Sequence, residues 1–207
     1  MNAPSADDLS RLRAIAEEGR SAPLLGGRHL IVWGSAMALA LLINWAVIER
    51  VLPLPGYSLA ISWFGIVFLA WTATALLGRD KAEAPGAFSV GNRVERAAWT
   101  TAGLFLMVLS LAIFARAMFS GGDPAAWSLF AIMSPIMFGA YAVALQVSAV
   151  ASDSAASRPF VPVALAFAAA TAFLIGESAQ YLVAAAGVAL VSIPPGLAHI
   201  RAEPKAA

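Results

Sequence analysis

Five polar side chains lie within or beside the long apolar runs of this chain, where an amide or a charge needs a partner or a function. Asn44 lies inside the first run, and Glu49 follows it directly. Arg116 lies near the end of a later run, and Glu177 and Gln180 mark the junction of the last two. Amide, carboxylate and guanidinium groups can bind a small polar solute at such depth. The five residues are therefore the candidate polar or ligand site.

Three interpretations of this set remain open. The long side chains can simply lie at the helix ends, where their charged groups reach the lipid headgroups. Arg116 can instead pair with Glu177 or Glu49 and hold the outer helix ends together. In a solute or signal site, Asn44, Arg116 and Glu177 are the members we would mutate first.

Other sources of chemistry are weak in this sequence. The chain has no cysteine, which excludes disulfides and thiolate sites. His29 and His199 could ligate a haem or a metal, but no third ligand and no haem-attachment motif accompanies them. The zinc-protease, nucleophile-elbow, Walker A and dinucleotide-binding motifs are also missing from the sequence. We therefore expect a non-enzymatic protein with no cofactor and no metal.

The composition indicates where these residues must lie. The chain is 60% hydrophobic and 12% charged, whereas soluble domains carry about 25% charged residues. Residues 30–48 contain only Ser35 and Asn44 as polar side chains. As a helix, this run is roughly 29 Å long, which matches the hydrocarbon core of a bilayer. A formal net charge of +1 gives no reason to expect nucleic-acid binding.

The pattern of apolar runs predicts an all-α integral membrane protein, a bundle of six transmembrane helices arranged as three helical hairpins. The hairpins begin near Arg28, Arg93 and Arg158 at equal intervals, which by itself does not establish a repeat. At the junction near Gly176 we favour a hairpin over one long broken helix. The predicted spans cover residues 30–50, 57–77, 97–119, 125–150, 160–176 and 178–200.

Prolines predict two irregularities. Pro135 should kink the fourth span, with a neighbouring group satisfying the carbonyl that the proline frees. Pro194 and Pro195 should break the last turns of the sixth span. The polar connection at 78–96, which contains Pro85, should have an irregular backbone.

The positive-inside rule gives the orientation. All of the 13 basic residues except Arg50 and Arg116 fall on one side of the predicted bundle. Both termini are therefore expected in the cytoplasm. Residues 1–27 would form a cytoplasmic segment, 28–200 the membrane domain and 201–207 a disordered tail. Small size, abundant alanine and the lack of cysteine favour a bacterial inner membrane.

The N-terminal segment could contact a partner. Ser5 and Asp8 have capping-box spacing, and apolar residues then recur at helical intervals to about residue 20. This amphipathic helix either rests on lipid or docks a cytoplasmic protein, together with the charged 78–96 loop. The small-residue pair Gly34 and Ala38 either packs the bundle or forms a homo-oligomer interface.

Two functional hypotheses follow. The first is a sensor or anchor that acts through a cytoplasmic partner, because the charged segments are extramembrane and catalytic residues are missing. The second is a small-solute transporter or channel with a site between the helices on the outer side, near Asn44, since kinked or broken helices often line substrate sites. Gly26-Gly27-Arg28-His29 also resembles a motif, to which the sequence attaches no function.

Overall fold

The computed structural model describes residues 10, 24–79, 86–121, 123–152 and 156–203, and every regular element in these ranges is helical. The protein is therefore all-α, as predicted. Residues 5–20 lie outside the described part except for Ser10, so their predicted helix stays a prediction. The elements are α2 (Gly27–Ile48), α3 (Tyr57–Arg79), α4 (Val90–Phe119), α5 (Pro124–Ser128), η1 (Leu129–Ile132), α6 (Met133–Ala151), α7 (Phe160–Phe173) and α8 (Ala179–Ala202).

Five helical stretches among the described residues are long and apolar enough to cross a membrane: α2, α3, α4, the continuous α5–η1–α6 stretch, and α8. The chain is therefore a multi-pass membrane protein. The fifth predicted span, 160–176, is longer than the helix that the structure shows there. Helix α7 has 14 residues, or about 21 Å, against a hydrocarbon core of about 30 Å. The chain turns after Phe173, and Gly176 adopts a φ of 95° that favours glycine.

Helix α4 begins earlier than the sequence indicates. The Ser89 hydroxyl accepts a hydrogen bond from the Asn92 N–H at 3.3 Å and caps the helix. The predicted irregular backbone of 78–96 is therefore wrong for residues 90–96, which are helical. Polar residues of this first stretch are buried by other parts of the chain, so their polarity does not place them in a loop.

The fourth span is irregular at the predicted place. A 3₁₀ turn, η1, separates α5 from α6, and Pro135 lies at the start of α6. Because proline has no N–H, the Ala131 carbonyl four residues earlier loses its helical donor. The Gln180 side-chain amide donates to this carbonyl at 2.7 Å. The prediction that a neighbouring group satisfies the freed carbonyl is confirmed.

The predicted break at Pro194 and Pro195 is wrong, because α8 continues through both residues to Ala202. Helix α8 packs closely along α2, and theirs is the most extensive helix pair in the described part of the chain. A Cβ added to Gly34 would come within 2.4 Å of the Ser192 Cβ, so glycine is what permits this approach. Packing along its length holds α8 helical where two backbone hydrogen bonds are lost.

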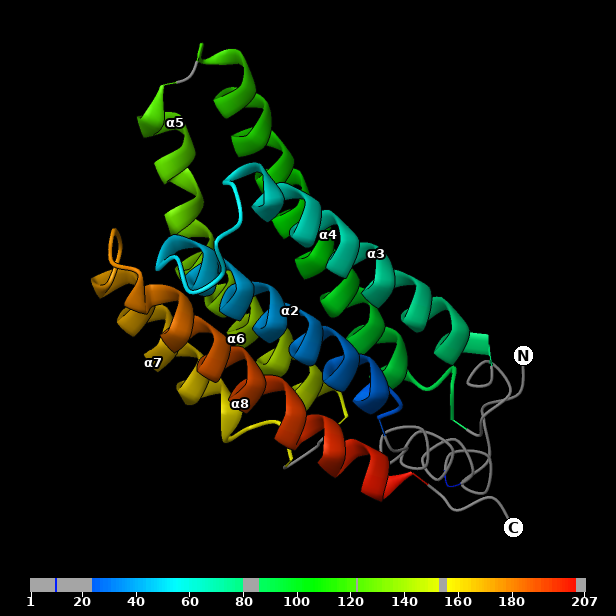
Figure 1. Cartoon of the computed structure of the whole chain (residues 1–207). Helices are drawn as coiled ribbons and strands as arrows, with labels where there is room; N and C mark the ends of the chain where they lie inside the picture. The colour runs from blue at the N-terminus through cyan, green and yellow to red at the C-terminus, as the bar shows by residue number, and fades with distance from the viewer. Residues whose placement is uncertain (1–9, 11–23, 80–85, 122, 153–155, 204–207) are drawn as a thin grey trace, which may run out of the picture.

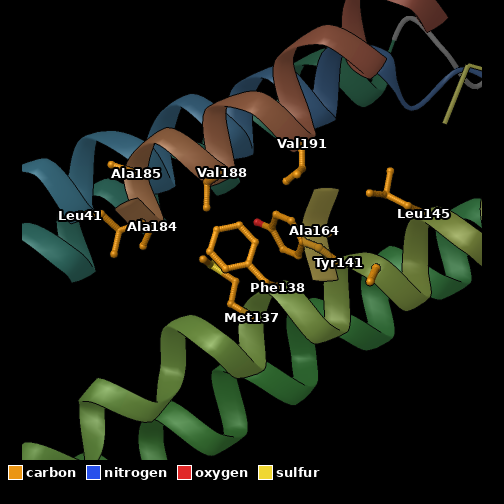
Figure 2. Packing of buried hydrophobic residues seen from close by; sticks show 11 residues of the cluster. Leu41, Met137, Phe138, Tyr141, Leu145, Ala164, Ala184, Ala185, Val188 and Val191 are labelled. Atoms are coloured by element: carbon orange, nitrogen blue, oxygen red, sulfur yellow. The ribbon is translucent and has the colours of Figure 1, made fainter. Parts of the chain in front are cut away.

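The apolar core lies between α6, α7 and α8. Phe138 is fully buried, and Figure 2 shows its ring pointing from α6 toward Val188 of α8. The ring stacks on Phe167 of α7 with centroids 5.5 Å apart. A Cβ on Gly187 would approach both rings to 2.6 Å, so this glycine makes room for the stack. The core therefore fixes the relative position of α7 and α8.

Helix α3 is peripheral. It packs against α2, and Figure 1 shows it at one edge of the bundle, with α7 at the other. The Trp33 indole donates to Thr74 at 2.9 Å and joins the two helices. Large side chains of α3 are exposed, such as Phe68 and Trp71, each at 70%. Such a surface is typical of a lipid-facing helix.

Candidate functional site

Four polar side chains are buried together where α2 and α4 begin and α8 ends, which we call the cluster end of the bundle. Asn92 and Glu95 come from α4, His199 from α8, and Ser157 from the turn that leads into α7. None of the four is more than 4% exposed. Buried polar and ionisable groups in a membrane protein mark a functional site by default. These residues, the buried polar cluster, are therefore the candidate site.

His199 lies between a hydroxyl and a carboxylate. Its Nε2 atom is 3.0 Å from the Ser157 Oγ, and its Nδ1 atom is 3.7 Å from the Glu95 Oε1. The first contact is a hydrogen bond whose direction depends on the tautomer. The second is longer than a hydrogen bond and becomes an ion pair when the imidazole is protonated.

Residues 24–26, which we call the strap, lie against this cluster just before α2. The Leu25 N–H donates to the Asn92 Oδ1 at 2.8 Å. The Gly26 N–H donates to the Glu95 Oε2 at 3.3 Å. The Asn92 amide group in turn donates to the Gly86 carbonyl at 3.0 Å. Backbone groups that precede the first helix are thus satisfied by side chains of α4.

The two glycines after Leu25 are required by this arrangement. A Cβ on Gly26 would lie 2.6 Å from the Glu95 Oε1. A Cβ on Gly27 would lie 2.5 Å from the Gly196 carbonyl oxygen and 2.9 Å from the His199 Cβ. The Gly26-Gly27 pair, which resembled a motif in the sequence, is thus explained by close packing on the carboxylate and on α8.

Charged groups surround the cluster at the protein surface. Arg28 of α2 and Glu203 after α8 are 3.8 Å apart, with side chains 45% and 17% exposed. Because this pair is partly hydrated, its contribution to stability is small. Four more arginines of this end are exposed to solvent: Arg93, Arg96, Arg158 and Arg201.

The order of Ser157, His199 and Glu95 is that of a nucleophile, a base and an orienting acid. The Ser157 side chain is completely buried, however, so a substrate carbonyl has no approach to its oxygen in this conformation. The distance of 3.7 Å between the His199 Nδ1 and the Glu95 Oε1 is also longer than the orienting hydrogen bond of a hydrolase. The arrangement is instead suited to hold a proton and to position the strap.

Two of the sequence-predicted site residues are buried and engaged by the protein itself. Asn44 accepts a hydrogen bond from the Trp63 indole at 3.4 Å, and the Tyr181 side chain lies next to it. Gln180 donates to the Thr171 carbonyl at 3.0 Å in addition to the Ala131 carbonyl. Both amides therefore join helices, and Gln180 fastens the start of α8 to the kink before α6.

The other three predicted residues, Glu49, Arg116 and Glu177, are exposed. In the part of the chain that the structure describes, no ion pair joins Arg116 to either carboxylate. Figure 1 shows the C-terminal end of α4 projecting away from the turn that precedes α8. The structure thus does not bring the five residues together, and a ligand site there stays a prediction.

Sequence reasoning missed the buried polar cluster. It placed Glu95 in the polar connection at 78–96 and considered His199 only as a possible haem or metal ligand. One local signal was present: Ser89 followed three positions later by Asn92 has N-cap spacing, which would have placed Glu95 inside the helix. Nothing local indicates Ser157, because 42 residues separate it from its partner His199.

The described residues contain no group of three or more His, Asp or Glu side chains that could hold a metal ion. Comparisons with protein-family models, with curated proteins and with solved structures found no match to this chain. The interpretation of the cluster therefore depends on its own geometry.

Proposed function

We propose that this chain is a non-enzymatic protein of the bacterial inner membrane that acts as a sensor or anchor for a cytoplasmic protein. The N-terminal segment, residues 1–23, would bind the partner. The observation that carries the proposal is the attachment of the strap to buried side chains of α4. This attachment lies directly between the proposed docking segment and the membrane helices.

The strap offers a short mechanical path. A displacement of the N-terminal segment acts on the Leu25 and Gly26 amides, and these bond to Asn92 and Glu95 at 2.8 and 3.3 Å. Glu95 faces His199, so the same displacement reaches α8 without an intervening flexible linker. Coupling of this kind needs a contiguous chain of packed and bonded groups, which the cluster supplies.

The distribution of charge supports a cytoplasmic cluster end. The exposed arginines Arg93, Arg96, Arg158 and Arg201 all belong to it. The opposite end has Arg50 and Arg116 together with the carboxylates Glu49, Asp123 and Glu177. Positive charge accumulates on the cytoplasmic side of membrane proteins. We therefore propose that both termini and all six helices follow the N-in, C-in arrangement of three hairpins.

The transporter alternative has less support. Its strongest residue is Asn44, a buried amide in α2. A solute would have to displace the contacts that Asn44 makes with Trp63 and Tyr181. Glu49, Arg116 and Glu177 do not converge with it. A site between the helices would thus require a conformation different from the present one.

Affinity purification in mild detergent tests the proposal. The intact chain is compared with a variant lacking residues 1–22, and a Glu177→Ala variant of the full chain is the matched control. We expect one protein to co-purify in stoichiometric amount with the intact chain and the control, and to be lost with the truncation. Size-exclusion chromatography verifies that the truncated bundle remains folded. Retention of the partner by the truncated chain, or no partner with either, would refute the proposal.

A further inference from the structure

We propose that protonation of His199 loosens the strap, and that Glu95 transmits the change because its carboxylate is shared between the imidazole and the Gly26 N–H. The inference rests on the proposed function, since it makes the strap the element through which the partner segment responds. The stimulus would be a fall in pH on the side of the membrane that the cluster end faces.

The position of the Glu95 carboxylate is the first step in the argument. One oxygen is 3.3 Å from the Gly26 nitrogen, and the other is 3.7 Å from the His199 Nδ1. Hydrogen bonds of ionised groups are usually about 2.7–2.9 Å long. Among the described residues, the carboxylate thus lies between two donors at more than the ideal distance from each, and a movement toward one donor is a movement away from the other.

Protonation changes only one of these two donors. A neutral imidazole has one N–H donor, whereas the imidazolium donates from both nitrogens. The Ser157 hydroxyl, 3.0 Å from Nε2, then acts as acceptor, and Nδ1 presents a positive N–H to Glu95. Attraction between opposite charges is strong where water is excluded. The carboxylate should move toward His199 and away from the Gly26 N–H.

Steric fit makes the strap sensitive to this movement. Because a Cβ on Gly26 would touch the carboxylate at 2.6 Å, the strap backbone lies directly on Glu95. A shift of the carboxylate therefore removes both a hydrogen bond and a packing surface from the strap. Leu25 would retain its bond to Asn92, so the expected change is a loosening and not an unfolding of the bundle.

Other charged groups define the controls. The strap has no titratable side chain, and the end of α6 contributes the buried hydroxyls of Ser148 and Ser152. Arginine stays protonated at every physiological pH. The only other histidine is His29 of α2, which must be tested separately. Among the described residues, the other charged or titratable groups on the elements around the cluster are Arg28, His29, Arg93, Arg96, Arg158, Arg201 and Glu203.

Spin-label distance measurements on the purified full-length protein test this inference. The chain has no cysteine, so an Ala22→Cys, Gly56→Cys variant carries labels at two chosen positions only. Position 56 is suitable because a Cβ there meets nothing within 4 Å. The protein is placed in lipid nanodiscs, and the distance distribution is recorded at several pH values from about 8 to about 5, across the usual range of histidine titration.

We expect a second, displaced population to appear in the distance distribution as the pH falls. The ratio of the two populations should change by up to about tenfold per pH unit, the limit for one proton. His199→Gln should remove the response, because glutamine cannot be protonated. His29→Gln should leave it intact. Gly26→Val should give the displaced population at every pH, which provides a positive control.

An unchanged distribution between the two pH limits would overturn the inference, whatever the variants do. A response that survives His199→Gln, or disappears with His29→Gln, would also overturn it, because the proton would then bind elsewhere. Since the measurement uses the purified protein without a partner, its failure leaves the co-purification test of the proposed function unaffected.

Discussion

The two ends of the bundle both contain glutamate side chains, which are buried at one end and exposed at the other. At the cluster end, Glu95 is 4% exposed, and its carboxylate lies beside the Gly26 N–H and the His199 imidazole. At the opposite end, Glu49 and Glu177 are exposed carboxylates. The difference arises from the strap, which covers the first turns of α4. An ionisable residue near a helix end acquires a specific role when a neighbouring segment excludes water from it.

The opposite end also has buried polar residues, and Gln180 is among them. It differs from Glu95 because it binds only backbone carbonyls and has no titratable neighbour in direct contact. Its amide holds the kink before α6, where Pro135 leaves a carbonyl without its donor. Burial at this end therefore stabilises the fold, whereas burial at the cluster end also creates a group that can respond to protons.

Loss of Glu95 should have the largest effect. Glu95→Ala removes the buried carboxylate that accepts from the Gly26 N–H and faces His199, and losing a hydrogen bond to a charged group costs about 1.5–3 kcal/mol. Unfolding by sodium dodecyl sulfate in mixed micelles measures the change. Glu177→Ala at the opposite end is the matched control, and its effect should stay within about 0.5 kcal/mol. Equal losses of stability in the two variants would show that the buried and the exposed carboxylate contribute alike, and would contradict the comparison of the two ends.

The second-largest effect on stability is expected from the close packing at the cluster end. Gly27→Ala places a Cβ 2.5 Å from the Gly196 carbonyl oxygen, and such overpacking costs about 1–3 kcal/mol. Gly65→Ala is the control in α3, where a Cβ meets nothing within 4 Å. That variant should be neutral or more stable by up to about 1 kcal/mol, since alanine favours helix. The same unfolding assay distinguishes them, and a neutral Gly27→Ala would contradict the packing.

The smallest effect concerns the opposite end. Gln180→Leu deprives the Ala131 carbonyl of its donor and should cost about 1 kcal/mol, a typical value for a hydrogen bond between membrane helices. Gln146→Leu, at an exposed position of α6, should change little. In a Pro135→Ala background, residue 135 supplies its own N–H, so the loss from Gln180→Leu should shrink. If Gln180→Leu lowers the free energy of unfolding by the same amount in that background, Gln180 does not stabilise the protein through the Ala131 carbonyl.

Several features of the fold follow from local sequence. The long apolar runs predict the helices α2, α3, α4 and α8, and Pro135 predicts the irregularity before α6. The length of α7 was overestimated because Leu174 and Ile175 are as apolar as the helix itself, and only the turn at Gly176 shortens it. For α8 the error was the opposite: Pro194 and Pro195 predicted an early end, but the helix continues because its packing on α2 outweighs the lost hydrogen bonds.

The candidate site was harder to predict from the sequence than the helices were. Asn44 and Gln180 are buried polar residues, as the sequence suggested, but their partners come from other helices. Glu49, Arg116 and Glu177 share a side of the predicted topology without meeting in the structure. Sequence position fixes the depth of a residue along the membrane normal, since helix rise is constant. It does not fix which face of the helix the residue occupies relative to neighbours.

By itself, the sequence determined that this protein is a multi-pass helical membrane protein, because partition into lipid depends on the composition of each segment alone. Only the tertiary structure decided that Glu95, Ser157 and His199 meet beneath the strap. The Gly26 N–H and Glu95 are 69 residues apart in sequence, and they meet because the first turns of α4 lie beside the strap that precedes α2. Contacts of this kind depend on how helices fit together, which local composition does not encode.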